Sequence, residues 1–86
     1  MTYKIEFTKT AQKELKKQSV QIQKRLLLAI IRLSANPKKG SVRPMIGVSS
    51  WRLRVGSYRV IYDINDNTLV ILIIKVGHRR DVYKND

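Results

Sequence analysis

The stretch Trp51–Ile64 constrains the fold of this chain more than any other, because its turn fixes how two strands pair. "WRLRVGSYRVIYDI" alternates apolar and polar residues on both sides of Gly56-Ser57. A two-residue turn with glycine first favours type II′ geometry, which joins antiparallel strands in one register. In that register, Arg54 on the first strand lies opposite Arg59 on the second.

Strict alternation sorts the side chains of this hairpin onto two faces. The face expected to pack on the rest of the protein is apolar and aromatic, with Trp51, Leu53, Val55, Tyr58, Val60 and Tyr62. The other face gathers Arg52, Arg54 and Arg59. Like charges directly opposite each other destabilise a β-ladder, so the facing pair Arg54 and Arg59 indicates a function beyond the fold. The alternative is a solvated face whose arginines pair with acids such as Asp63 and Asp81.

The N-terminal part of the sequence predicts a short strand followed by two helices. Apolar and polar residues alternate over Tyr3–Phe7, which is typical of a half-buried strand. Thr8 can cap a helix over Lys9–Gln18, and Ser19 can cap a second helix over Val20–Asn36. The second helix carries an apolar stripe at helical spacing and ends before a proline, whose ring disfavours helical geometry in the preceding residue.

Three further strands are expected after a long loop. Residues 37–50, "PKKGSVRPMIGVSS", contain two prolines and two glycines, which favours a connection without regular structure. Strands then follow at about Ser50–Val55, Tyr58–Ile64 and Thr68–Val76. The order β-αα-βββ predicts an α+β fold, in which a helical hairpin packs on one face of a mostly antiparallel sheet.

The last of these strands is apolar on both faces, which is typical of a strand inside a sheet. Continuous alternation places Leu69, Ile71 and Ile73 toward the helices. It places Val70, Leu72 and Ile74 toward the arginines. The arginines would then lie beside an apolar floor, a combination that suits an anionic ligand with bases to stack, or a partner segment that covers the face.

Charge narrows the possible partners. The 86 residues, expected to form one domain over 1–86, include 18 Lys and Arg against six Asp and Glu, a formal charge of +12. Such a field attracts polyanions, so nucleic acid or an acidic protein is a better candidate partner than a membrane surface. A merely soluble basic surface is the alternative.

Several classes of protein are disfavoured by what the sequence lacks. Without cysteine there is no disulfide framework or thiolate zinc site, and one histidine cannot build a metal site alone. We therefore expect no metal and no cofactor. No apolar run is long enough to cross a membrane, and the N-terminus lacks the apolar segment of a secretory signal. We expect a cytoplasmic protein.

The end of the chain gathers further groups with useful chemistry. His78, Arg79, Arg80 and Tyr83 follow the last strand closely. We expect this segment to lie near the arginine face, which would bring these side chains to the same site. The alternative is that the lone histidine is structural and the two arginines form a solvated turn.

The motifs described above, together with "NPKKG" and "RPMIG", resemble the RelE toxins of the RelE/ParE superfamily, the toxin halves of prokaryotic type II toxin–antitoxin pairs. "WRLRVGSYRVIY" and "VGHRRDVY" are the most specific parts. The resemblance implies a microbial RNase-like fold and cleavage of mRNA in the ribosomal A site. In that reaction the 2′-hydroxyl attacks the adjacent phosphate. It also implies a ribosome, an mRNA and an acidic RelB-like antitoxin as partners.

The resemblance also implies roles for individual residues. Arg59 would bind the scissile phosphate, Arg79 or Arg80 would stabilise the transition state, and Tyr83 would orient or protonate reacting groups. The full set of expected catalytic residues is Arg54, Arg59, His78, Arg79 and Tyr83. The expected RNA-binding residues are Lys38, Lys39, Arg43, Arg52 and Arg80.

One departure from the family pattern bears on the chemistry. Arg52 and Arg54 stand where many relatives have lysines, and arginine stays protonated in proteins. Proton abstraction must then come from another group, such as His78 or Tyr83, unless the activity is weak or the ribosome supplies part of the catalysis. A ParE-like inhibitor of DNA gyrase without nuclease activity and a plain RNA-binding domain are the other readings.

Overall fold

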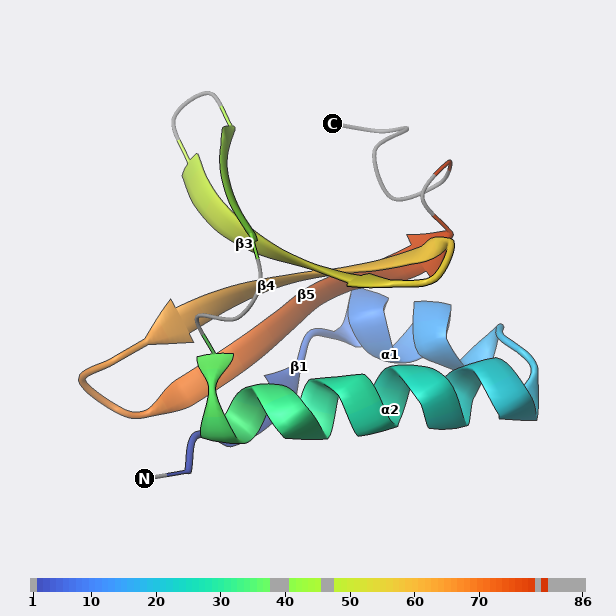
Figure 1. The fold of residues 1–86 in the computed structure, drawn as a ribbon, viewed down its shortest axis with the longest axis horizontal. Coiled ribbons are helices and arrows are strands. Elements are labelled where there is room, and N and C mark those ends of the chain that lie inside the picture. Colours follow the sequence, from blue (N-terminus) through green and yellow to red (C-terminus); the bar gives the residue numbers. More distant parts are fainter. Residues whose placement is uncertain (1, 38–40, 46–47, 79, 81–86) are drawn as a thin grey trace.

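The structure, a computed structural model, shows two helices on one face of a five-stranded sheet (Figure 1). It describes residues 2–37, 41–45, 48–78 and 80, and over 41–45 and 48–49 the description is limited to the backbone. The elements are β1 (Lys4–Phe7), α1 (Lys9–Lys16), α2 (Val20–Ala35), β2 (Ser41–Met45), β3 (Val48–Val55), β4 (Tyr58–Asn65) and β5 (Val70–His78).

The strand order is β1-β5-β4-β3-β2. β1 pairs with β5 in parallel, and the other three pairs are antiparallel. This arrangement confirms the predicted α+β class, the helical hairpin on one face and the mostly antiparallel sheet. It also confirms that the last strand of the sequence lies inside the sheet, between β1 and β4.

The predicted loop over residues 37–50 was wrong, because most of that stretch is strand. β2 pairs antiparallel with β3, which begins at Val48. Pro44 pairs with Ser49 within this ladder. A proline cannot donate to a ladder, but an edge strand needs donors on one side only, and β2 is the edge of the sheet. The sheet therefore has one strand more than expected.

Both predicted helix caps are present. The Thr8 hydroxyl accepts a hydrogen bond from the Ala11 amide at 3.0 Å, and Ser19 does the same for Ile22 at 3.3 Å. Each bond satisfies an amide that has no partner inside the helix. The caps fix where each helix begins and so set the two helices as a hairpin beneath the sheet (Figure 1).

The core lies between the helices and the sheet. Its members from the helices are Ala11, Leu26, Ile30 and Leu33, and those from the strands are Val60, Tyr62, Ile71, Ile73 and Val76. The buried Tyr62 ring stacks on the Trp51 ring, with the ring centroids 6.3 Å apart. The Tyr62 hydroxyl donates a hydrogen bond to the Pro37 carbonyl at 2.7 Å. Because a buried hydroxyl needs a partner, this bond ties the segment after α2 to the middle of the sheet.

A β-bulge interrupts the pairing of β4 with β5. Ile61 pairs with Lys75, but the next residue, Tyr62, pairs with Ile73, so Ile74 is an extra residue on β5. Predicted alternation holds up to Ile73, which is fully buried toward the helices. Beyond the bulge the faces exchange, so Val76 is buried and Lys75 lies on the opposite face.

The start of α1 holds the bulged part of β5. β1 ends opposite Ile73, so β5 continues past its parallel neighbour. Beyond that point the Thr8 amide donates to Ile73 O at 2.9 Å, and the Thr8 hydroxyl donates to Ile74 O at 2.9 Å. The Val76 amide donates to the Glu14 carboxylate at 3.0 Å. Backbone groups that a strand would have paired are thus paired by α1.

Candidate RNA-binding and catalytic face

The turn between β3 and β4 has the predicted geometry and register. Gly56 has φ of 60°, and among the described residues the one non-glycine with positive φ is Leu69, so Ser57 is not in that region. Positive φ at the first turn residue alone is the signature of a type II′ turn. Arg54 pairs with Arg59, as predicted.

Three arginines therefore share the face of the sheet that the helices leave open. Arg52 pairs with Ile61, and Arg54 with Arg59, while the intervening residues Leu53 and Val60 pack toward the core. We call the open side of β3, β4 and β5 that carries Arg52, Arg54 and Arg59 the arginine face. Its side chains stand where a polyanion can reach them without disturbing the core.

The Arg59 guanidinium is held in place by the turn beside it. Its Nη1 donates to the carbonyls of Gly56 at 3.0 Å and Tyr58 at 2.9 Å. A guanidinium has five N–H donors, and these two bonds use one nitrogen. The edge formed by Nε and Nη2 has the geometry to grip two oxygens of one phosphate. The turn thus pre-orients Arg59 for anion binding.

Lys75 is a member of this face that the sequence reasoning missed. Lys75 on β5 pairs with Ile61 on β4, the strand that also carries Arg59. Ile61 pairs on its other edge with Arg52 of β3. Unbroken alternation would place Lys75 with Ile71 and Ile73 in the core. A lysine at a core position was the available signal, because a charged side chain is almost never buried without a partner.

His78 lies on the other side of the sheet, so the prediction that placed it near the arginines was wrong. His78 pairs with Tyr58, and the two rings are arranged edge to face with their centroids 5.7 Å apart. It lines a small cleft of about 230 Å³, together with Glu14, Lys17, Gln18, Val76 and Gly77. The His78 Nδ1 accepts a hydrogen bond from the Arg80 amide at 3.2 Å. The sheet therefore separates this imidazole from the arginine face.

The remaining predicted site residues are only partly described. Arg80 is exposed. The backbone of Arg43 pairs with Ser50 on β3, but its side chain lies outside the description. The other predicted site residues, Lys38, Lys39, Arg79 and Tyr83, lie outside the described residues altogether.

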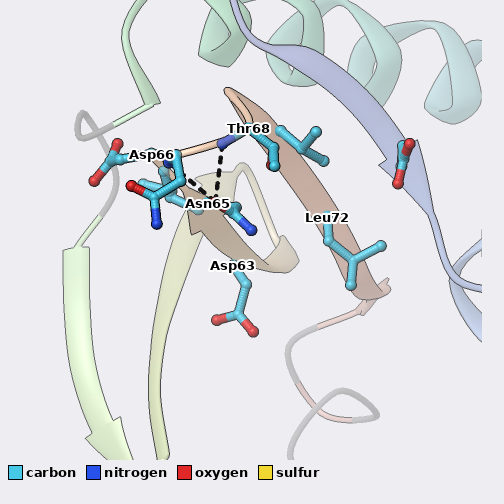
Figure 2. Close-up of a pocket in the computed structure, with 9 residues that line it drawn as sticks. Asp63, Asn65, Asp66, Thr68 and Leu72 are labelled. Atoms are coloured by element: carbon cyan, nitrogen blue, oxygen red, sulfur yellow. Dashed lines mark hydrogen bonds between the residues drawn. The ribbon is translucent and has the colours of Figure 1, made fainter.

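A second, larger cavity than the cleft beside His78 lies at the other end of the same open face. It has a volume of about 700 Å³, and it is lined by Glu6, Asp63, Ile64, Asn65, Asp66, Asn67, Thr68, Val70 and Leu72 (Figure 2). Three of the chain's six acidic residues are in this set. Since this cavity is acidic, it is a poor site for RNA, and the arginine face is the better candidate although it is less enclosed.

The turn beside this cavity is well ordered by hydrogen bonds. The Asn65 side-chain oxygen accepts from the amides of Asn67 at 3.0 Å and Thr68 at 3.1 Å (Figure 2). The Tyr3 hydroxyl donates to the Asp66 carboxylate at 2.6 Å. That hydrogen bond is the main cause that raises the pKa of Tyr3 above its ordinary value, with partial desolvation and the negative charge of Asp66 adding to it.

Two further features of the described residues bear on function. Their His, Asp and Glu side chains form no group of three that could hold a metal ion. Neither α1 nor α2 is long and apolar enough to cross a membrane.

Comparison with known proteins identifies the family. A family model described as "ParE toxin of type II toxin-antitoxin system, parDE" matches residues 5–83. The chain is 34% identical to Toxin RelG of Mycobacterium tuberculosis over 92 residues, covering 98% of this chain and 99% of that protein. It is 33% identical to Toxin RelE3 of Methanocaldococcus jannaschii over 85 residues, covering 93% and 94%.

A solved structure agrees with these relationships. The chain superposes on a chain of the toxin–antitoxin complex RelBE2 from Mycobacterium tuberculosis with a TM-score of 0.83 and 30% identity, covering 92% of this chain and 100% of that one. The family model carries the ParE name, and the relatives carry the RelE name. The chain therefore belongs to the RelE/ParE superfamily of type II toxin–antitoxin toxins, and it is a RelE-type member.

Proposed function

We propose that this toxin is a ribosome-dependent endoribonuclease that cleaves mRNA in the A site. The observation that carries the proposal is the register of β3 and β4, which sets Arg54 directly opposite Arg59 on the open face. A sheet gains nothing from two facing cations, but a phosphate bound between them would relieve their repulsion. Because the proposed substrate is mRNA on translating ribosomes, the protein would act in the cytoplasm.

The proposed reaction is attack of a ribose 2′-hydroxyl on the adjacent phosphate. Charge builds up on the phosphorane oxygens as this transition state forms, and fixed cations that face those oxygens lower its energy. The Arg59 guanidinium, anchored by the Gly56 and Tyr58 carbonyls, is suited to that role. Arg52 and Arg54 would hold the neighbouring backbone phosphates, and the net charge of +12 would favour docking on ribosomal RNA.

The experiment that tests this proposal is a reconstituted translation reaction with cleavage mapped by primer extension. We expect codon-linked cuts with the wild-type protein and none with Arg59→Ala. The matched control is Asp63→Asn, which lies on the same strand and the same open face but lines the acidic cavity. Equal cleavage by Arg59→Ala and wild type, with both variants folded by circular dichroism, would remove the site.

The name of the matched family model favours one second candidate, inhibition of DNA gyrase without nuclease activity. The arginine face argues against it, because gyrase binding does not require a phosphate site. The same protein preparation can decide between the two activities. Inhibition of gyrase supercoiling, with no cuts in translated mRNA, would favour the gyrase candidate.

We also propose that a small acidic RelB-like antitoxin neutralises the toxin. The related toxin of the RelBE2 structure is in a complex with its antitoxin. On this chain, α2 exposes apolar side chains that the core does not use, namely Val20, Leu27, Leu28 and Ile31. Leu28 and Ile31 are each 59% exposed and lie near each other on the helix. An amphipathic antitoxin segment would cover this stripe.

A charge placed on that stripe tests the antitoxin surface. We expect Ile31→Glu to lower the affinity for the acidic protein encoded beside the toxin by about tenfold or more, because a buried interface would then hold an unpaired charge. Gln21→Glu adds the same charge to an exposed position of α2 and should change the affinity little. Equal affinities for the two variants, measured by calorimetry, would place the antitoxin elsewhere.

A further inference from the structure

We propose that Lys75 is the group that takes the proton from the attacking 2′-hydroxyl. This inference rests on the proposed nuclease function and assigns a step that the function leaves open. The arginines of the face cannot accept a proton, because their charged form persists at any working pH. His78, the other titratable candidate within the described residues, lies on the helix side of the sheet.

Lys75 is the one lysine of β3, β4 and β5. Ile61 on β4 pairs with Arg52 on β3 and with Lys75 on β5, so Arg52 and Lys75 flank it. Arg59 pairs with Gly77, which is two residues after Lys75, so Lys75 and Arg59 are diagonal neighbours. Diagonal neighbours on one sheet face are about 7–8 Å apart at the backbone, within reach of long side chains. A nucleotide on this face can therefore contact Arg59 and Lys75 together.

Gly77 adds no side chain to this face beside Arg59. As the partner of Arg59, it is the residue of β5 that would otherwise place a side chain beside the guanidinium. Glycine inside a strand commonly marks a place where a ligand approaches the backbone closely. Gly77 and Ile61 are both buried, so the groups of this face that a nucleotide would meet are the partly exposed side chains of Arg59 and Lys75.

The bulge at Ile74 is what brings Lys75 to the face. Without the extra residue, Lys75 would lie in register with the buried side of β5. Bulges next to active sites often serve to redirect one side chain. Here the bulge is fixed on its open edge by Thr8, which bonds the carbonyls of Ile73 and Ile74, and by Glu14, which accepts from the Val76 amide. Lys75 therefore has a fixed backbone position.

The neutral Lys75 amine takes the 2′-hydroxyl proton, the 2′-oxygen forms a bond to phosphorus, and the bond from phosphorus to the 5′-oxygen breaks. The departing oxygen takes a proton from water. The products are a 2′,3′-cyclic phosphate and a 5′-hydroxyl end. Lysine can perform this role because, unlike arginine, it can exist as a neutral amine in a protein site.

The competing reading is that Lys75 is only a fixed positive charge that binds phosphate. Lys75→Arg separates the two readings. It keeps a positive charge on a side chain of similar length, but it removes the amine that can lose its proton and act as a base. We expect its single-turnover cleavage on ribosomes to fall about 100-fold or more, while its affinity for ribosomes changes by less than about threefold. Lys4→Arg is the matched control on the same open face and should cut at the wild-type rate.

A chemical rescue makes the test sharper, because the chain contains no cysteine. Lys75→Cys can be alkylated at that one thiol with 2-bromoethylamine, which rebuilds a lysine-like side chain whose amine is more acidic. We expect the unmodified and carbamidomethylated forms to be inactive. The aminoethylated form should recover cleavage, with the rising limb of its pH–rate profile moved to lower pH.

The outcomes separate the failure of this inference from the failure of the function. If wild-type protein cuts no translated mRNA, the proposed function fails and Lys75 has no step to perform. If wild type cuts and Lys75→Arg cuts equally fast with an unchanged pH profile, only the Lys75 inference is overturned. A rescued activity whose pH profile does not move would also overturn it, since the amine would then act as a charge alone.

Discussion

The two ends of the open sheet face differ in charge and in how their side chains are stabilised. The arginine face sets Arg54 against Arg59, a contact that costs stability. The other end, which we call the acidic end, is formed by the lining residues Glu6, Asp63 and Asp66. There two of the three carboxylates have partners: the Lys4 Nζ lies 3.9 Å from a Glu6 carboxylate oxygen, and the Tyr3 hydroxyl donates to Asp66.

This difference teaches which end is shaped by folding and which by binding. The acidic end resembles an ordinary turn region, because Asn65 and Asp66 are hydrogen-bonded within the chain. The arginine face instead holds two cations directly opposite each other, an arrangement that an anion bound between them would stabilise. Since both ends share one sheet and one core, substitutions at matching positions can separate the contribution to activity from the contribution to stability.

The largest expected effect comes from charge reversal on the arginine face. Arg54→Glu should lower cleavage of translated mRNA by about 100-fold or more, because it places a negative charge where the phosphate binds. The opposite reversal, Asp63→Arg at the acidic end, should leave cleavage within a few-fold. Primer extension at equal protein concentrations measures both variants. A comparable loss in the two variants would mean that the ends do not differ in function.

A smaller effect, on stability, is expected at the acidic end. Asn65→Ala removes the acceptor for two turn amides and should lower the free energy of unfolding by about 1 kcal/mol, measured in urea. Cleavage below the unfolding transition should stay unchanged. Asn67→Ala is the matched control, because Asn67 contributes its backbone amide to the turn. Equal stability of the two variants would contradict the assigned role of the Asn65 side chain.

Removing one of the facing arginines should stabilise the fold slightly, although it lowers activity. We expect Arg54→Thr to raise the free energy of unfolding by a few tenths of a kcal/mol at low salt, and less at high salt, because salt screens the repulsion from Arg59. Arg59→Thr and the double variant complete a double-mutant cycle. A coupling energy of zero at low salt would show that the two guanidinium groups do not repel each other in the folded protein.

The smallest expected effect is at alkaline pH. The Tyr3 pKa is raised in the folded protein, so its hydrogen bond to Asp66 contributes stability below the ordinary tyrosine pKa. That contribution is lost as pH rises through the folded-state value. Unfolding measured from about pH 8 to about pH 11 should therefore show a steeper loss of stability in wild type than in Tyr3→Phe. Parallel curves would exclude a role for this phenol.

The hairpin and the helices could be predicted because their signals are local. Gly56 alone sets the turn type, and Thr8 and Ser19 mark the two helix starts within a few residues. The arginine pairing then follows from counting outward from the turn. These are the elements for which the sequence reasoning agrees with the structure.

The parts that could not be predicted depend on distant neighbours. β2 tolerates Pro44 only because it lies at the edge, a fact of the whole sheet. The bulge at Ile74 is held by Thr8, which is 66 positions away in sequence. A sequence read strand by strand cannot include such contacts, and so it missed Lys75. It also placed His78 on the wrong side, because the exchange of faces begins at that bulge.

The parallel pairing of β1 with β5 also orders events in time. Ile5 pairs with Ile71, and Phe7 with Ile73, so the first strand to be synthesised finds its partner only when the last strand has been made. Contacts of such large sequence separation form late and slowly. A toxin that attacks translation is itself a product of translation. Its sheet, and the α1 contacts that fix β5, would be completed only after residues through His78 have left the ribosome that made it.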